Sequence, residues 1–125
     1  MIAYGATKEA VAYLTETLAL ELSGNNIQVN AISPGSIHTK MWEETRDLAK
    51  QIGDEDLYGK GIQVTTGGGD SIESAADLAV FLASPASDKL TGKLLRAYSD
   101  DLEILESNIS LIMQSDIFTM RRVEI

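Results

Sequence analysis

Residues Ala6–Leu22 predict a helix that carries apolar side chains on two of its sides. One side repeats at i, i+3, i+7 and i+11, and the other is marked by Tyr13 and Leu20, seven residues apart. A helix that is apolar on two sides needs two packing partners rather than one. The members of the first side are Val11, Leu14, Leu18 and Leu22, and Gly24 is expected to end the helix in the left-handed conformation.

Two short segments predict strands. Ile27–Ser33 reads IQVNAIS, is rich in β-branched residues, and is stopped by Pro34-Gly35. Lys93–Tyr98 follows a Thr-Gly turn and predicts a second strand.

Three further segments predict helices. The first lies around Met41–Lys50, and the second follows the glycine triplet Gly67–Gly69, with Asp70 and Glu73 as a capping pair. Apolar spacing gives this second helix and a final one their buried faces. These faces are Ala75, Leu78, Ala79 and Leu82, and then Leu102, Leu105, Ile109 and Ile112.

Strands that alternate with helices indicate an α/β fold with a parallel sheet. Two strands are too few for such a sheet, because its strands expect neighbours and cover on both faces. We therefore interpret residues 1–125 as a single partial domain, with an extra C-terminal helix and tail over 100–125.

Composition excludes several functions. The chain has 125 residues, a net charge of −9, no cysteine and one histidine, His38. An acidic chain is a poor match for nucleic acid or for an anionic membrane surface. Without cysteines or a histidine cluster we expect no metal site. No apolar run is long enough to span a membrane, and no signal-peptide pattern is visible, so we expect a cytoplasmic protein.

Tyr4 and Lys8 lie four residues apart, and residues at this spacing share one face of a helix. A free tyrosine ionises only near pH 10. A neighbouring ammonium favours the phenolate, which allows a phenol to act as a general acid or base. The spacing alone is weak evidence, and by itself it favours the alternative interpretation, two exposed residues on the first turn of a helix.

Four motifs in order resemble the C-terminal half of the short-chain dehydrogenase/reductase family. Members carry Tyr-x-x-x-Lys, a helix ending in LA-x-EL, a strand reading I-x-VN-x-I-x-PG, and a later FLAS followed by TG. The matching stretches here are YGATKEAVAYLTETLALEL, NIQVNAISPGSIHTKM and AADLAVFLASPASDKLTGKLL, which span Tyr4 to Tyr98. The resemblance implies the C-terminal part of a doubly wound, Rossmann-type sheet domain that lacks the N-terminal strands.

The resemblance implies an oxidoreductase that interconverts an alcohol and a carbonyl of a small molecule, with NAD or NADP as cofactor. Tyr4 matches the catalytic acid/base, and Lys8 matches the lysine that supports it and binds the nicotinamide ribose. The expected cofactor-binding residues are Tyr4, Lys8, Pro34, Gly35, Ile37 and Thr39.

The segment after Thr39 matches the family's variable substrate lid, with Met41 and Trp42. Its alternative interpretation is a surface helix on which Trp42 packs inward. We expect His38 to be a bystander, although its position beside Thr39 could also bring it to the pocket. Gly67–Gly69 lacks the Lys-Ser/Thr of a phosphate-binding loop, so we expect these glycines to serve a turn.

The family's glycine-rich dinucleotide motif and its catalytic serine are not among these 125 residues. We therefore do not expect this chain alone to bind the cofactor. The exposed strand edge and half-covered first helix predict a companion N-terminal half or a homo-oligomer. The alternative function is a non-catalytic, truncated module that folds by self-association and has no activity alone. AYSDD replaces the family's usual DGG, so the longer tail puts the usual tetramer in doubt.

Overall fold

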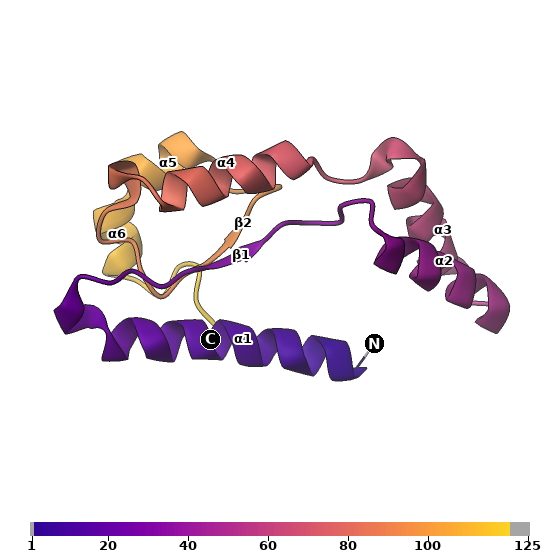
Figure 1. Ribbon diagram of the computed structural model, residues 1–125, viewed down its shortest axis with the longest axis horizontal. Helices are drawn as coiled ribbons and strands as arrows, with labels where there is room; N and C mark the ends of the chain where they lie inside the picture. Colours follow the sequence, from indigo (N-terminus) through magenta and orange to yellow (C-terminus); the bar gives the residue numbers. More distant parts are fainter. Residues whose placement is uncertain (1, 121–125) are drawn as a thin grey trace.

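The structure is a computed structural model that describes residues 2–120. Met1 and residues 121–125, the end of the predicted tail, lie outside the described residues. Helices and two short strands alternate along the chain (Figure 1). They are α1 (Ile2–Glu21), β1 (Ala31–Ser33), α2 (Lys40–Ile52), α3 (Glu55–Gln63), α4 (Ile72–Leu82), β2 (Leu94–Arg96), α5 (Leu102–Ser107) and α6 (Ile109–Met113). Two short 3-10 helices, η1 (Ser23–Asn25) and η3 (Pro85–Ser87), and one kinked π-helical segment, η2 (Val64–Gly68), connect them.

The two strands pair in parallel, as the sequence predicts. α1 runs along one side of the pair and α4 along the other, while α2 and α3 project beyond one end (Figure 1). This α/β arrangement is compatible with part of a Rossmann-like domain. The register joins Ala31 to Leu94, Ile32 to Leu95 and Ser33 to Arg96.

The first strand is shorter than the predicted Ile27–Ser33, because side chains replace its first ladder bonds. The Val29 N–H donates to Thr91 Oγ1 at 2.9 Å, and the Asn30 side-chain amide donates to the Leu90 carbonyl at 2.8 Å. These bonds hold the segment extended beside its neighbour without a regular ladder. The sequence locates the segment but overestimates its length.

The second strand is also shorter than the predicted Lys93–Tyr98. Immediately after it the chain turns, and the Arg96 N–H donates to Asp100 Oδ2 at 2.6 Å. The Asp100 N–H in turn donates to the Arg96 carbonyl at 2.9 Å. A local turn thus takes the hydrogen-bonding groups that a longer strand would have used.

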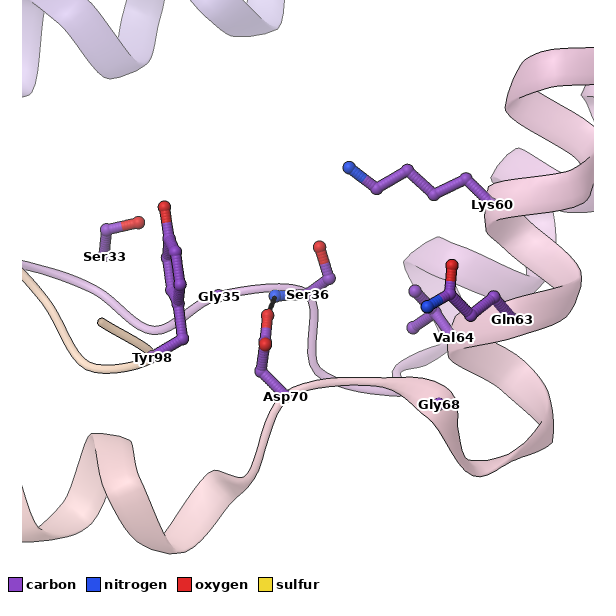
Figure 2. A pocket seen from close by; sticks show the side chains of 9 residues that line it. All are labelled: Ser33, Gly35, Ser36, Lys60, Gln63, Val64, Gly68, Asp70 and Tyr98. Atoms are coloured by element: carbon purple, nitrogen blue, oxygen red, sulfur yellow. Dashed lines mark hydrogen bonds between the residues drawn. The ribbon is translucent and has the colours of Figure 1, made fainter.

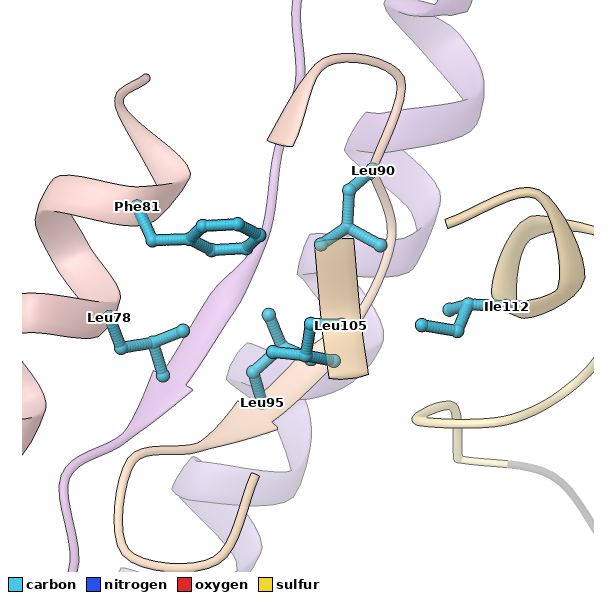
Figure 3. Packing of buried hydrophobic residues seen from close by; sticks show 6 residues of the cluster. All are labelled: Leu78, Phe81, Leu90, Leu95, Leu105 and Ile112. Atoms are coloured by element: carbon cyan, nitrogen blue, oxygen red, sulfur yellow. The ribbon is translucent and has the colours of Figure 1, made fainter. Parts of the chain in front are cut away.

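The hydrophobic core lies between β2, α4 and the C-terminal helices (Figure 3). The expected final helix is two short helices, because Asn108 (φ −119°, ψ 13°) interrupts the predicted stripe. Leu105 and Ile112 of that stripe are buried, whereas Leu102 and Ile109 are partly buried and pack against the core. The predicted extra segment is therefore a structural part of the core, whose buried members are Leu78, Phe81, Leu90, Leu95, Leu105 and Ile112.

The start and the buried face of α4 differ from the prediction. Ser71, not Asp70, is the N-cap, and its hydroxyl accepts from the N–H groups of Glu73 and Ser74. Leu78 is buried as expected, but Phe81 is the second buried residue of the helix. Of the other predicted members, Ala79 is exposed, while Ala75 and Leu82 are partly buried.

α1 turns its small side chains inward. Its buried residues are Ala12, Thr15, Glu16 and Ala19. Neither predicted apolar side is fully covered: Leu14 is 54% and Leu20 71% exposed, while Leu18 and Leu22 are partly buried. The helix thus has one packing partner among the described residues instead of the two that its pattern requires.

The end of α1 and the helices after β1 also differ from the prediction. The left-handed residue after α1 is Asn26 (φ 52°), not Gly24. The helix predicted at Met41–Lys50 runs over Lys40–Ile52, and the sequence does not predict α3 at all. Gly61 allows α3 to approach α2 closely, since a Cβ there would lie 2.6 Å from Arg46 Cβ.

The residues after α6 return to the edge of β2. The Leu94 N–H donates to the Phe118 carbonyl at 2.8 Å. Lys93, almost fully buried, donates its ammonium to the Ser115 and Ile117 carbonyls, both at 3.0 Å. The Met120 N–H donates to Glu16 Oε1 of α1 at 2.7 Å. The tail therefore joins β2 to the opposite helix.

Candidate functional site

A hollow of about 600 Å³, the first hollow, lies between α1, the end of β1 and the start of α2. It draws on segments that are separated by up to several tens of residues in the sequence. The carboxyl ends of parallel strands are where such folds place their ligands. Every residue predicted for the site lines this first hollow, namely Tyr4, Lys8, Pro34, Gly35, Ile37, Thr39, Met41 and Trp42.

Tyr4 and Lys8 share one face of α1, as their spacing predicts. The Lys8 Nζ lies 5.3 Å from the centre of the Tyr4 ring. The Tyr4 side chain is 50% exposed, and its hydroxyl has no hydrogen bond to any described residue. The phenol is therefore accessible to a ligand and has a cation beside it.

Gly35 forms the rim of the first hollow at the end of β1. Its φ of +91° is rarely adopted by other residues. A Cβ at this position would also lie only 2.4 Å from Asp70 Oδ2. Asp70 fixes the turn from below, because its carboxylate accepts the Ser36 N–H at 2.5 Å and its N–H donates to the Ser36 carbonyl at 3.1 Å.

Thr39 precedes α2 and is its N-cap residue. Its backbone is extended (φ −143°, ψ 164°), but its hydroxyl makes no capping hydrogen bond. Thr39 and the partly buried Ile37 both line the first hollow. The Thr39 hydroxyl can therefore bond to a ligand there without breaking an internal contact.

Met41 and Trp42, on the first turn of α2, form one wall of this hollow. Trp42 is partly buried, and the Lys60 Nζ of α3 lies 5.8 Å from the centre of its ring. His38 is not among the lining residues, and its Nε2 lies 3.0 Å from Glu43 Oε1 at the surface.

The glycine triplet lies in the connection from α3 to α4. Gly67 has a φ of +99°, and a Cβ on Gly69 would lie 2.6 Å from the Ser36 carbonyl oxygen. The triplet thus lets the two chain segments meet below the Gly35 turn. Residues 2–120 contain no group of three His, Cys, Asp or Glu side chains that could hold a metal ion. None of the helices in that range is long and apolar enough to cross a membrane.

A second hollow of about 470 Å³ lies on the other side of the same turn, and sequence reasoning missed it (Figure 2). It shares Ser33 and Gly35 with the first hollow. Lys60 and Tyr98 both line it although they lie on distant segments, and no local motif connects them. The lining residues are Ser33, Gly35, Ser36, Lys60, Gln63, Val64, Gly68, Asp70 and Tyr98.

Comparison with known proteins identifies the family to which this chain belongs. A family model described as "Enoyl-(Acyl carrier protein) reductase" matches residues 1–97. A 2-dehydro-3-deoxy-D-gluconate 5-dehydrogenase of Bacillus subtilis is 41% identical over 93 residues, which are 74% of this chain and 35% of that protein. The chain therefore belongs to the short-chain dehydrogenase/reductase family.

Other relatives differ in what their names say they act on. A 3-oxoacyl-(acyl-carrier-protein) reductase FabG of Thermotoga maritima is 35% identical over 92 residues, covering 74% of this chain and 35% of its own length. A galactitol 2-dehydrogenase (L-tagatose-forming) of Cereibacter sphaeroides is 38% identical over 94 residues, covering 74% and 34%. The chain spans about a third of the length of these relatives. No solved structure matches it.

Proposed function

We propose that this chain supplies the proton-transfer side of an NAD(P)-dependent oxidoreductase that interconverts an alcohol and a carbonyl. The observation that carries the proposal is the gathering of all the predicted site residues around one hollow. Family membership supports it, because the named relatives are dehydrogenases and reductases.

The first hollow fits the nicotinamide end of a dinucleotide. Gly35 keeps the rim free of a side chain, and the Thr39 hydroxyl has no capping bond to give up. We assign Lys8, Pro34, Gly35, Ile37 and Thr39 to the cofactor, with Lys8 toward the ribose. NAD or NADP would supply the acceptor or donor of a hydride.

Tyr4 would move the proton. In the direction of reduction its hydroxyl donates a proton to the substrate oxygen, and in the direction of oxidation it accepts one. The ammonium of Lys8, held beside the ring, stabilises the negative charge that remains on the phenol oxygen. Met41 and Trp42 would hold the substrate against this pair, as a lid.

Tyr4→Phe tests the assignment in a nicotinamide-coupled assay of the protein with a panel of small alcohols and carbonyls. Loss of a general acid/base typically costs about 10²- to 10⁴-fold in turnover, and we expect cofactor affinity to change little. Tyr13→Phe is the matched control, because Tyr13 lies on the same helix but does not line the hollow. Equal losses in the two variants would contradict the assignment.

The exposed apolar sides of α1 favour a second candidate, a non-catalytic module that is completed by association. Val11, Leu14 and Leu20 are each more than half exposed on this helix, and exposed apolar surface of this kind marks an interaction site. We propose that a second copy or a companion segment carrying the family's N-terminal half covers it.

Sedimentation velocity tests association, and cofactor binding and turnover then separate the two candidates. If association occurs through α1, Leu14→Glu should dissociate the assembly, whereas Val80→Glu on the exposed side of α4 should not. A native protein that remains monomeric at all concentrations would contradict self-association. A native assembly without cofactor binding or turnover would favour the non-catalytic module over the enzyme.

A further inference from the structure

The second hollow contains polar side chains that bond to nothing else described. We propose that it binds the carboxylate-bearing end of a polyhydroxylated substrate, such as a sugar acid. The inference rests on the proposed function in one respect, since it takes the neighbouring Tyr4 as the reacting end of the same site.

Lys60 supplies the positive charge. Lys60 and Asp70 are the charged residues that line the second hollow. The Asp70 carboxylate accepts the Ser36 N–H at 2.5 Å and so holds the floor of the hollow. Lys60 makes no ion pair with any described residue, and its ammonium lies 5.8 Å from the centre of the Trp42 ring. Lys60 is an exposed residue, and its ammonium, which has no carboxylate partner among the described residues, can pair with the anionic end of a ligand.

Three hydroxyls surround the same space. Figure 2 shows the Lys60 side chain extending from α3 over the turn, with the hydroxyls of Ser36 and Tyr98 pointing to the same side. The side-chain oxygens of Ser33, Ser36 and Tyr98 have no hydrogen bond within residues 2–120. Hydroxyls elsewhere, such as those of Thr65 and Ser84, bond to backbone carbonyls at 2.8 Å and 2.7 Å.

This donor set selects a ligand class. Hydroxyls both donate and accept hydrogen bonds, so Ser33, Ser36 and Tyr98 match a ligand that carries several hydroxyls of its own. The ammonium adds a preference for a negative end. Polyols satisfy the first condition and simple carboxylates the second, but a sugar acid satisfies both.

The second hollow adjoins the first. They share Ser33 and Gly35, so they meet at the end of β1. The volume of about 470 Å³ lies in the usual range for small-molecule sites. A sugar acid with its carboxylate at Lys60 would therefore extend toward Tyr4 across the Gly35 turn.

Titration with D-gluconate, D-glucitol, acetate and inorganic phosphate tests the inference without any cofactor. Trp42 is the sole tryptophan, so its fluorescence reports a ligand that draws the Lys60 ammonium from the indole ring. We expect gluconate to bind about tenfold or more tighter than neutral glucitol, the size of a charge-assisted contact. Acetate should also bind more weakly than gluconate, because it has no hydroxyls to bond.

Lys60→Met keeps an unbranched side chain of nearly the same length and removes the charge, and we expect it to lose that tenfold preference. Lys50→Met is the matched control, because Lys50 is an exposed lysine whose ammonium lies 5.9 Å from the Tyr58 ring, outside the hollow. A retained preference in Lys60→Met, an equal loss in both variants, or no binding of gluconate to the native protein would overturn the inference. Tighter binding of phosphate than of gluconate would overturn the carboxylate assignment.

The same titration keeps this inference distinct from the proposed function. Gluconate binding without turnover in the nicotinamide-coupled assay would contradict the enzyme and leave the sugar-acid site standing. Turnover of neutral alcohols without gluconate binding would support the enzyme and contradict the sugar-acid site.

Discussion

Gly35→Ala should be the most damaging of the small changes around the site. Its backbone has a φ of +91°, where a side chain costs about 1–2 kcal/mol. The new Cβ would also lie 2.4 Å from Asp70 Oδ2, so Asp70 must move and release the Ser36 N–H. A hydrogen bond to a charged group contributes about 1.5–3 kcal/mol. We therefore expect a loss of about 2.5–5 kcal/mol in the free energy of unfolding.

Three other glycines separate the two causes. Gly53 has a φ of +74° but open space around it, so Gly53→Ala measures the backbone strain alone. Gly69 has an ordinary φ of −83° but lies against the Ser36 carbonyl, so Gly69→Ala measures close approach alone. Gly24 has neither constraint, and Gly24→Ala should be neutral or slightly stabilising.

The measurement is the free energy of unfolding from urea denaturation followed by circular dichroism. The expected order of loss places Gly35→Ala above Gly53→Ala, with Gly24→Ala close to zero. If Gly35→Ala cost no more than Gly53→Ala, the contact with Asp70 would contribute nothing to the free energy of unfolding. The turn would then be held by something other than the Asp70 clamp.

Three more outcomes follow from the same structure. Leu95→Ala, at a fully buried core position, should lower the free energy of unfolding by about 2–5 kcal/mol, whereas Val80→Ala at an exposed position should change it little; equal losses in urea would contradict the assigned core. Ser71→Ala should cost about 1 kcal/mol by the same measurement, because Ser71 caps α4, and no loss would mean that the cap lies elsewhere. The Ser71 hydroxyl also holds the pKa of the Glu73 carboxyl below its usual value, through a hydrogen bond of 2.6 Å. Because the folded-state pKa is depressed, this contribution is present above the unfolded pKa of Glu73 and is lost as pH falls through the folded one; NMR titration should show the Glu73 pKa rising in Ser71→Ala.

The resemblance to the family supplies the residues of the first hollow, and chain topology explains why they lie together. Tyr4 and Lys8 share a helix face by spacing, while Pro34 and Gly35 end a strand. A parallel strand pair brings its carboxyl ends to one edge, and Thr39 follows at the start of the next helix. Local periodicity and this topological rule are consistent with the residues that the resemblance assigns, and their chemical roles remain predictions.

The second hollow could not be predicted, because no local pattern connects its parts. Lys60 comes from α3, a helix containing two glycines, which helix propensity disfavours. Gly61 is tolerated there because α3 packs closely on Arg46 of α2, and that contact is tertiary. Tyr98 reaches the same place from the turn after β2. Side chains that meet only through packing leave no period in the sequence.

The errors in the strands and caps have a common physical cause. Asn30 and Thr91 offer side-chain hydrogen bonds that compete with the ladder, and Asp70 bonds across the fold instead of capping α4. Asparagine, threonine and aspartate all form such local or cross-chain bonds in addition to regular ones. Which partner each of them takes depends on which backbone N–H lies within reach, and this is set only when the chain has folded.

Gly35 connects the proposed chemistry to the proposed recognition. The turn at Gly35 is a wall of both hollows, and the Asp70 clamp fixes it from the α4 side. A substrate whose carboxylate binds Lys60 must extend past this turn to reach Tyr4. Movement of the turn would therefore change the position of the carboxylate site relative to Tyr4. Gly35→Ala should therefore weaken gluconate binding as well as stability, whereas Gly53→Ala, strained to a similar degree but remote from both hollows, should lower stability alone. Unchanged gluconate affinity in Gly35→Ala would separate the turn from recognition.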